Sequence, residues 1–354
     1  CRTGTAIDTA EQRFVARTCH LGRFQWIIGN CVLIIFIRAA VRYTPGIARE
    51  RETTDSMTMG TESFDSRYKA LDTRASRDVL TLVLDAQQRG IAAVRERIDE
   101  IAAAAEAAAA CLAAGTGGRL VYAGAGTSAR LGVQDGVELT PTFGWPNARL
   151  AFAIAGGMDS LTRAIEGAED DTAAAAAAID ALVVGPADVC IAVSASGSTP
   201  YTCAACATAR RRGAQTIGIA NNADTPLLAA AQYPILIDSG AEPVAGSTRM
   251  TAGTTQKVVL NLLSTLIMIR LGRVHDGMMV DVIATNDKLV ARSVGMVCEI
   301  AAVDETEARR ALKAADGHVK TAVLVAGGLT AEAGRTLLDR HAGSLRAALA
   351  ALGR

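Results

Sequence analysis

Two short stretches of glycine and hydroxyl side chains stand where a strand would turn into a helix. The first covers residues 124–132 (Gly-Ala-Gly-Thr-Ser-Ala-Arg-Leu-Gly) and the second covers residues 194–201 (Ser-Ala-Ser-Gly-Ser-Thr-Pro-Tyr). Free backbone N–H groups at a helix N-terminus, together with the positive end of the helix dipole, favour an anion such as a phosphate. We therefore predict a phosphate site built from six hydroxyl side chains, which are Thr127, Ser128, Ser194, Ser196, Ser198 and Thr199.

Neither turn has the residues that a nucleotide site requires. Position 129 is Ala where a dinucleotide fingerprint needs Gly, and the Gly-Lys-Ser/Thr of a P-loop is absent from both turns. No lysine stands in either turn, so helix dipoles and hydroxyl groups would hold the ligand. This arrangement suits a phosphomonoester on a sugar better than a nucleotide with Mg²⁺. Hydroxyl side chains are also ordinary helix caps, and the first turn alone leaves that alternative open.

The segments around these turns alternate between apolar runs and helical patterns. Short apolar runs predict strands at 120–123, 150–155, 189–193, 216–220 and 234–237. Helices are predicted at 75–115, 159–166, 172–182, 200–212, 225–232 and 251–271. Buried strands that alternate with helices are typical of an α/β fold with a doubly wound parallel sheet. Both turns would then lie at the carboxyl ends of parallel strands and face one crevice.

The first 56 residues differ in character from the rest of the chain. Their apolar run at 26–37 has twelve residues, which falls short of the roughly 20 needed to span a bilayer. The basic flanks resemble a signal peptide, but Arg38 follows the run at once and no small-residue cleavage site precedes the folded part. We expect a non-native or disordered extension, with Met57 or Met59 as the natural start, and no membrane segment. The remainder divides into helices at 57–116, an α/β domain at 117–275 and small helices at 276–354.

Composition excludes several classes of protein. The 354 residues include 36 Lys and Arg against 36 Asp and Glu, so a nucleic-acid binder that relies on net positive charge is disfavoured. Hydrophobic residues make up 50% of the chain, which excludes disorder for most of it. The eight cysteines are scattered, and Cys203 and Cys206 have no second Cys pair or His near them for zinc. A reducing cytoplasm and no metal site fit best.

Four longer stretches give the chain a specific resemblance. Residues 124–128 and 194–199 look like the two phosphate turns of the sugar isomerase (SIS) domain. The wider stretches 124–144, 164–171, 246–261 and 279–289 resemble one subfamily, the N-acetylmuramic acid 6-phosphate etherases. Among them are Glu166-Gly-Ala-Glu-Asp-Asp171 and Gly246-Ser-Thr-Arg-Met-Thr-Ala-Gly-Thr-Thr-Gln-Lys257. The similarity runs from about residue 61 to the C-terminus.

The resemblance implies a carbon–oxygen lyase that needs no cofactor. Members of this family cleave the D-lactyl ether at C3 of N-acetylmuramate 6-phosphate, giving N-acetylglucosamine 6-phosphate and D-lactate. The implied route is elimination and hydration through the open-chain aldehyde. A base removes the C2 proton, an acid protonates the departing lactate oxygen, and water then adds across the double bond. Such an enzyme serves amino-sugar catabolism and cell-wall recycling.

The family's two proposed acid/base glutamates map onto Glu138 and Glu169. Glu138, which we expect in a loop after the first turn's helix, is assigned to the leaving oxygen, and Glu169 is its partner; which of them contacts C2 stays open. Glu166 is a rival in the same loop, and on residue types alone an acidic cluster is usually a solvated surface. Arg249 and Lys257, and similarly Arg130, are candidates to neutralise the lactyl carboxylate or complete the phosphate site. The alternative for these three cations is a structural ion pair.

The chain departs from the family pattern at a few positions. Ala129 replaces a usual Gly, Gly136-Val137 replaces Ala-Ser, Ser198 replaces Arg, and Thr251 stands where Lys is typical. The loss of two cations raises the prospect of an altered substrate preference, although both glutamates are intact.

Two other functions compete with the lyase on the same fold. One is a non-catalytic sugar-phosphate regulator, like the related glucokinase regulatory protein, and the other is an aldose–ketose isomerase. Partners are therefore a small phosphosugar and, as the long apolar helix at 251–271 and the family imply, a second copy of the chain that completes the site.

Overall fold

The computed structural model describes residues 60–115, 117–163 and 165–354. The predicted extension at 1–56 and its suggested starts at Met57 and Met59 lie outside these residues.

A parallel sheet of five strands forms the centre of the α/β region, as predicted. The strands are β1 (Leu120–Gly124), β2 (Leu150–Ile154), β3 (Val189–Ser194), β4 (Gln215–Ala220) and β5 (Tyr233–Leu236). Their order is β2-β1-β3-β4-β5, so the direction of winding reverses between β1 and β3. Every residue of β1 and β3 is buried, which explains why the strands are continuous apolar runs in the sequence. Gly124 pairs with Val193, and this register brings the two predicted phosphate turns side by side.

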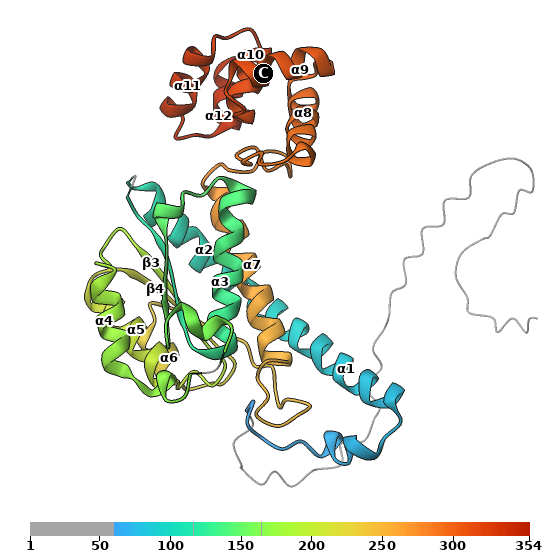
Figure 1. Ribbon diagram of the computed structural model, residues 1–354, viewed down its shortest axis with the longest axis vertical. Coiled ribbons are helices and arrows are strands. Elements are labelled where there is room, and N and C mark those ends of the chain that lie inside the picture. Colours follow the sequence, from blue (N-terminus) through green and yellow to red (C-terminus); the bar gives the residue numbers. More distant parts are fainter. Residues whose placement is uncertain (1–59, 116, 164) are drawn as a thin grey trace, which may run out of the picture. The chain divides into compact units, whose positions relative to one another are not determined.

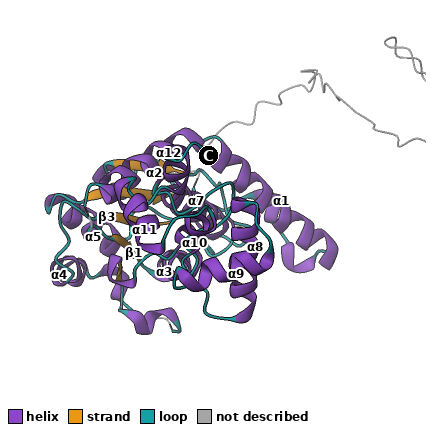
Figure 2. Cartoon of the chain, turned by 90° about the horizontal axis from the view of Figure 1, so that it is seen from above, coloured by secondary structure: helices purple, strands orange, loops and turns teal. Residues whose placement is uncertain are grey.

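Helices cover both faces of the sheet (Figure 1). One face carries α4 (Thr172–Ala181), α5 (Pro200–Arg211) and α6 (Pro226–Ala230), and the other carries α2 (Ile98–Ala113), α3 (Gly126–Phe143) and α7 (Thr251–Arg270). Figure 2 shows the strands from above, with α4 and α5 on one side of them. α1 (Ser76–Arg95) packs against α7.

The helix α7 packs against each of the other helices on the second face of the sheet. Among the described residues it is the one helix with the length and hydropathy to cross a membrane, with a mean hydropathy of 1.2 over 18 residues. In this window 56% of the residues are buried, because α7 packs against α1, α2 and α3. Its apolar character is thus accounted for in large part by core packing.

The remaining helices enclose a hydrophobic core of their own. They are α8 (Asp287–Ala301), α9 (Glu305–Ala314), α10 (Val319–Ala326), α11 (Ala331–Arg340) and α12 (Leu345–Ala351). The hairpins α9–α10 and α11–α12 repeat one design. Each begins with a side-chain cap, at Asp304 and Thr330, and each turns through two residues of positive φ, at 316–317 and 342–343.

Two predicted helices differ from the structure. The helix expected at 159–166 is reduced to a 3₁₀ turn, Met158–Leu161, since Gly156, Gly157 and Gly167 adopt positive φ and end regular structure on both sides. The helix expected at 225–232 is only Pro226–Ala230, because Gln232 already donates its backbone N–H to Thr216 at the start of the β5 ladder.

Candidate active site

Two open helix N-termini meet at the carboxyl edge of the sheet. α3 begins after Ala125 and α5 begins after Thr199, and neither N-cap side chain accepts a hydrogen bond from its own helix. The N–H groups in the first turn of α3, and those of Tyr201 and Thr202 that follow Pro200 in α5, therefore remain available to a ligand. Because α3 follows β1 and α5 follows β3, the two positive helix ends point at one place.

The serine turn before α5 holds three hydroxyl groups close together. Ser194 Oγ lies 2.9 Å from Thr199 Oγ1 and 3.3 Å from Ser196 Oγ. The backbone N–H of Gly197 donates to Ser194 Oγ at 3.1 Å, which fixes the turn. Gly197 has a φ of +69°, and an added Cβ would lie 2.4 Å from Thr225 Oγ1. Only glycine fits this position without a shift of the turn.

The first turn is anchored through Ser128. The Ser128 side chain is buried, and its hydroxyl donates to Gln256 Oε1 at 2.9 Å. Gln256 in turn donates from Nε2 to Asn221 Oδ1 at 2.9 Å, so α3, α7 and the end of β4 are tied together. The hydroxyl hydrogen of Ser128 is thus engaged within the protein, whereas Thr127 makes no such side-chain bond. Ser128 positions the turn.

A pocket of about 380 Å³ lies between the two turns, and we call it the hydroxyl pocket. Its lining brings together all six predicted hydroxyl side chains, Thr127, Ser128, Ser194, Ser196, Ser198 and Thr199. The acidic side chains in its lining are Glu62, Glu169 and Asp170. No Lys or Arg of the described chain lines it, so helix ends and hydroxyl groups are its electropositive features.

The two predicted acid/base glutamates are placed differently. Glu169 is exposed in a 3₁₀ turn, Ala168–Asp170, and lines the hydroxyl pocket. Glu138 lies within α3, and the expectation of a loop is wrong because the helix continues to Phe143, where Gly144 ends it in a left-handed conformation. Twelve residues separate Glu138 from the start of α3, which is about 18 Å along the axis. Glu138 is exposed and does not line the pocket of its own chain.

The predicted cations also lie outside the hydroxyl pocket. Arg249 is exposed next to Thr248, which does line the pocket, and Lys257 is exposed on α7. At the N-terminus of α7 the buried carboxylate of Glu242 accepts hydrogen bonds from the backbone N–H groups of Thr251 and Ala252, both at 2.8 Å. This third helix end is therefore already neutralised by the protein.

Glu62 lines the hydroxyl pocket and was not predicted. The buried Thr61 holds it in place, since the Thr61 backbone N–H donates to Asn222 Oδ1 and Asn222 Nδ2 donates to Thr61 Oγ1, both at 2.9 Å. Gly246 also lies close to this carboxylate, since a Cβ added there would be 2.8 Å from Glu62 Oε2. The residues that anchor Glu62 are about 160 positions away along the chain, so no local sequence pattern marks it.

A second pocket of about 440 Å³ adjoins the hydroxyl pocket, and we call it the arginine pocket. The two share Ala125, Gly126, Thr127 and Glu169 in their linings. Arg130, Arg163 and Glu166 line the arginine pocket alone. Glu169 thus stands at the boundary between a hydroxyl-rich space and a space with two guanidinium groups.

The cysteines show no reactive or metal-binding arrangement in the described part of the chain. Cys203 and Cys206 are both free thiols on α5, and burial raises the pKa of the Cys206 thiol to about 12. No group of three or more His, Cys, Asp and Glu side chains is placed to hold a metal ion in residues 60–115, 117–163 and 165–354.

Comparison with known proteins gives extensive matches. Residues 100–210 match the glucokinase regulatory protein N-terminal SIS domain, and residues 171–266 match the SIS domain. The chain is 46% identical over 290 residues to N-acetylmuramic acid 6-phosphate etherase of Deinococcus radiodurans, covering 82% of this chain and 94% of that protein. The etherases of Streptomyces coelicolor (45%, covering 83% and 94%) and Yersinia pestis strain Pestoides F (43%, covering 83% and 100%) are similarly related. With this identity over nearly the whole length of its relatives, the chain belongs to the N-acetylmuramic acid 6-phosphate etherase family.

Proposed function

We propose that the protein cleaves the C3 D-lactyl ether of N-acetylmuramate 6-phosphate to N-acetylglucosamine 6-phosphate and D-lactate by elimination and hydration. The observation that carries this proposal is the position of Glu169 in the same pocket as two open helix N-termini and six hydroxyl side chains. The relatives' name supports the choice of substrate.

The phosphate would occupy the hydroxyl pocket. There, backbone N–H groups of α3 and α5 and the hydroxyl groups of Ser194, Ser196 and Thr199 donate to its oxygens. The sugar then extends towards Glu169. In the open-chain form the C1 carbonyl acidifies the C2 proton, a carboxylate removes it, and a carboxyl group protonates the lactate oxygen as the C3–O bond breaks. Water adds to the resulting double bond at C3 and restores the hydroxyl.

The second carboxyl group, Glu138, is proposed to act on the site of a second copy of the chain. It stands about 18 Å along α3 from its own phosphate turn, too far for direct proton transfer there. Next to it, Val137 is a large apolar side chain that is 47% exposed, on the same side of α3 as the exposed Gln134 and Pro141. A homodimer would cover this part of α3 and place Glu138 of the partner subunit near Glu169.

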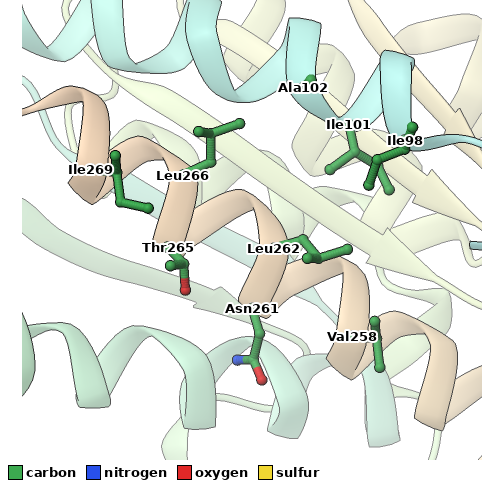
Figure 3. Close-up of a pocket in the computed structure, with 9 residues that line it drawn as sticks. All are labelled: Ile98, Ile101, Ala102, Val258, Asn261, Leu262, Thr265, Leu266 and Ile269. Carbon is green, nitrogen blue, oxygen red and sulfur yellow. The ribbon is translucent and has the colours of Figure 1, made fainter. Parts of the chain in front are cut away.

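An apolar groove beside α3 supports the homodimer. The groove, about 490 Å³, runs between α2 and α7 and is lined by Ile98, Ile101, Ala102, Val258, Asn261, Leu262, Thr265, Leu266 and Ile269. Figure 3 shows Leu262 and Leu266 directed towards α2, whereas Asn261 points towards α3, where it donates to Asp135 Oδ1 at 2.7 Å. Asn261 thus links the lining of the groove to α3, the helix that carries Glu138.

Two exposed leucines on α1 add to the apolar surface that a second copy could cover. Leu80 and Leu84 are 68% and 57% exposed, one helical turn apart. Gly90 brings α1 against Thr251 and Thr255 of α7, so these leucines lie on the part of α1 that precedes the packed crossing. A second copy that covers the groove and α1 would remove this apolar surface from water. We propose a cytoplasmic homodimer that acts in amino-sugar catabolism and cell-wall recycling.

The test is release of D-lactate from N-acetylmuramate 6-phosphate. We expect release by the wild type and its loss in both Glu138→Gln and Glu169→Gln. If Glu138 acts across the dimer, a mixture of the two inactive variants, unfolded and refolded together, forms hybrid dimers with one intact site. About a quarter of the wild-type activity should return, since half of the dimers are hybrids.

Other results would redirect the proposal. Phosphosugar binding without lactate release would favour a regulator, to which the match with the glucokinase regulatory protein domain also points. Formation of a ketose phosphate without lactate would favour an isomerase. No return of activity in the mixture, with both variants dimeric, would refute the action of Glu138 across the dimer.

A further inference from the structure

We propose that the arginine pocket binds the carboxylate of the lactyl group, and that Arg130 and Arg163 thereby select a muramate phosphate over the corresponding glucosamine phosphate. The inference rests on the proposed function and adds the residues that recognise the leaving group. Arg130 and Arg163 thus take the carboxylate-binding role that the sequence analysis considered for Arg249 and Lys257.

The hydroxyl pocket and the arginine pocket adjoin each other, as the two anionic groups of the substrate require. The substrate has two anionic groups, a phosphate on C6 and a carboxylate on the ether at C3. The structure has two adjoining spaces with complementary chemistry, and Glu169 lines both of them. With the phosphate among the hydroxyl groups and the carboxylate among the guanidinium groups, the C3–O bond falls at the boundary where Glu169 stands.

Arg130 is held ready for a planar anion. Its Nε donates to the carbonyl oxygen of Leu161 at 3.1 Å and its Nη2 donates to the carbonyl oxygen of Ser160 at 2.8 Å. These bonds use two of the five N–H groups of a guanidinium and fix its plane, and the others remain available. The side chain is half-buried on α3, one turn after the phosphate turn. A fixed cation loses little conformational entropy when a carboxylate binds.

Arg163 adds a second guanidinium from the bend that follows the 3₁₀ turn Met158–Leu161, which Arg130 holds. It pairs with Asp159 at 2.9 Å, and both side chains are largely exposed, so the pair itself contributes little to stability. Its guanidinium can therefore turn to a ligand carboxylate at small cost. Glu166 and Glu169 also line the pocket and balance the two cations. The pocket has no excess of positive charge. It would therefore recognise a carboxylate through the positions of its guanidinium N–H donors.

The other candidate cations do not reach this space. Arg249 and Lys257 line neither the hydroxyl pocket nor the arginine pocket. The acidic lining of the hydroxyl pocket, with Glu62 and Asp170 beside Glu169, disfavours a second anion there. Within one chain the arginine pocket is therefore the better place for the carboxylate.

The experiment compares two ligands that cannot react. Reduction of C1 to the alcohol removes the carbonyl that elimination requires, so N-acetylmuraminitol 6-phosphate and N-acetylglucosaminitol 6-phosphate differ only by the lactyl group. Calorimetry on the full chain should show about tenfold tighter binding of the muraminitol phosphate by the wild type, the size expected for one charge-assisted contact. In Arg163→Gln and Arg130→Lys this preference should fall to less than about threefold, with unchanged affinity for the glucosaminitol phosphate.

Arg309→Gln is the matched control. Arg309 is an exposed arginine that pairs with an acid four residues away, Glu305, as Arg163 pairs with Asp159, but it lies on α9. Its substitution should leave the preference intact. Arg130 also donates to two backbone carbonyl oxygens, so the Arg130→Lys result counts only if its melting temperature stays within a few degrees of the wild type. Arg163 is exposed, and the Arg163→Gln result is sufficient by itself to decide the test.

The outcomes separate this inference from the proposed function. A wild type that releases D-lactate but binds both alcohols equally, or an Arg163→Gln variant that keeps the full preference, overturns the role of the arginine pocket and leaves the lyase standing. A wild type that binds neither alcohol and releases no D-lactate refutes the proposed function itself.

Discussion

Substitution of Gly197 by Ala should disable phosphosugar binding through a single added methyl group. The position has a φ of +69°, where an L-residue is strained by about 1–2 kcal/mol. The new Cβ would also lie 2.4 Å from Thr225 Oγ1 and 2.6 Å from Thr225 Cβ, so the turn or the start of α6 must move. The shifts needed to accommodate the added methyl group cost about a further 1–3 kcal/mol of stability. We expect Gly197→Ala to reduce the free energy of unfolding by about 2–5 kcal/mol.

The effect on binding follows from the same movement. The N–H of Gly197 donates to Ser194 Oγ at 3.1 Å, and its carbonyl accepts from Leu227 N at 3.0 Å. A shift of this peptide displaces the hydroxyl groups of Ser194, Ser196 and Thr199 relative to the N-terminus of α5. Loss of one or two good hydrogen bonds to a phosphate corresponds to about tenfold or more in affinity.

Gly317→Ala is the control for backbone strain alone. Gly317 has a φ of +81° in the turn between α9 and α10, and a Cβ there would meet nothing within 4 Å. It should cost about 1–2 kcal/mol and leave ligand affinity unchanged. The assay is thermal unfolding together with calorimetric titration of N-acetylglucosamine 6-phosphate. If Gly197→Ala binds the sugar phosphate as tightly as Gly317→Ala does, the serine turn does not hold the phosphate.

Three further predictions address other parts of the structure. Glu62→Gln should keep the fold but lower kcat/KM about tenfold or more, because a substrate-facing carboxylate is lost; unchanged kinetics would exclude Glu62 from the site. Leu262→Asp should give a monomer in light scattering with little D-lactate release, whereas an intact dimer would show that the apolar groove is not the interface. Asp188→Asn should lower the free energy of unfolding in urea at pH 7 by about 3 kcal/mol, because buried Asp188 accepts hydrogen bonds from Arg119 and Gly185. Burial alone would raise the pKa of Asp188, but these bonds outweigh it and lower the pKa. The stabilisation is therefore present above the unfolded pKa of about 4 and lost as pH falls through the folded value, so the variant and the wild type should converge in acid; a constant difference from pH 7 to pH 2 would contradict this cause.

The sheet and the hydroxyl pocket could be predicted because their signals are local. A parallel strand buried on both faces is a continuous apolar run, as Val189–Ser194 is, and the turn that follows it needs glycine and hydroxyl residues at the same few positions. Pro200 at the first turn of α5 marks the helix start in the same way. Each of these features depends on neighbours along the chain, so the sequence pattern is sufficient.

Residues placed by distant contacts could not be predicted. Glu62 enters the pocket only through the reciprocal bonds between Thr61 and Asn222, which no periodicity reports. The position of Glu138 depends on where α3 ends, and Pro141 suggests an earlier end than the structure has. Gly136 allows α3 to approach Tyr122 and Phe152, whose ring atoms lie 3.0 Å from the Cβ that another residue would add. Glycine at this position therefore suits the close packing of α3 on the sheet.

The most direct test of the central claim is to follow the oxygen of water. The protein is incubated with N-acetylmuramate 6-phosphate in water enriched in ¹⁸O, and both products are analysed by mass spectrometry. Elimination and hydration in the hydroxyl pocket predicts one ¹⁸O in the C3 hydroxyl of N-acetylglucosamine 6-phosphate and none in the hydroxyl of D-lactate. The C1 oxygen exchanges with water in the open-chain aldehyde, so fragment ions must assign the label to C3. Label in the lactate hydroxyl, with none at C3 of the sugar, would mean that water attacks the lactyl carbon and would contradict the account.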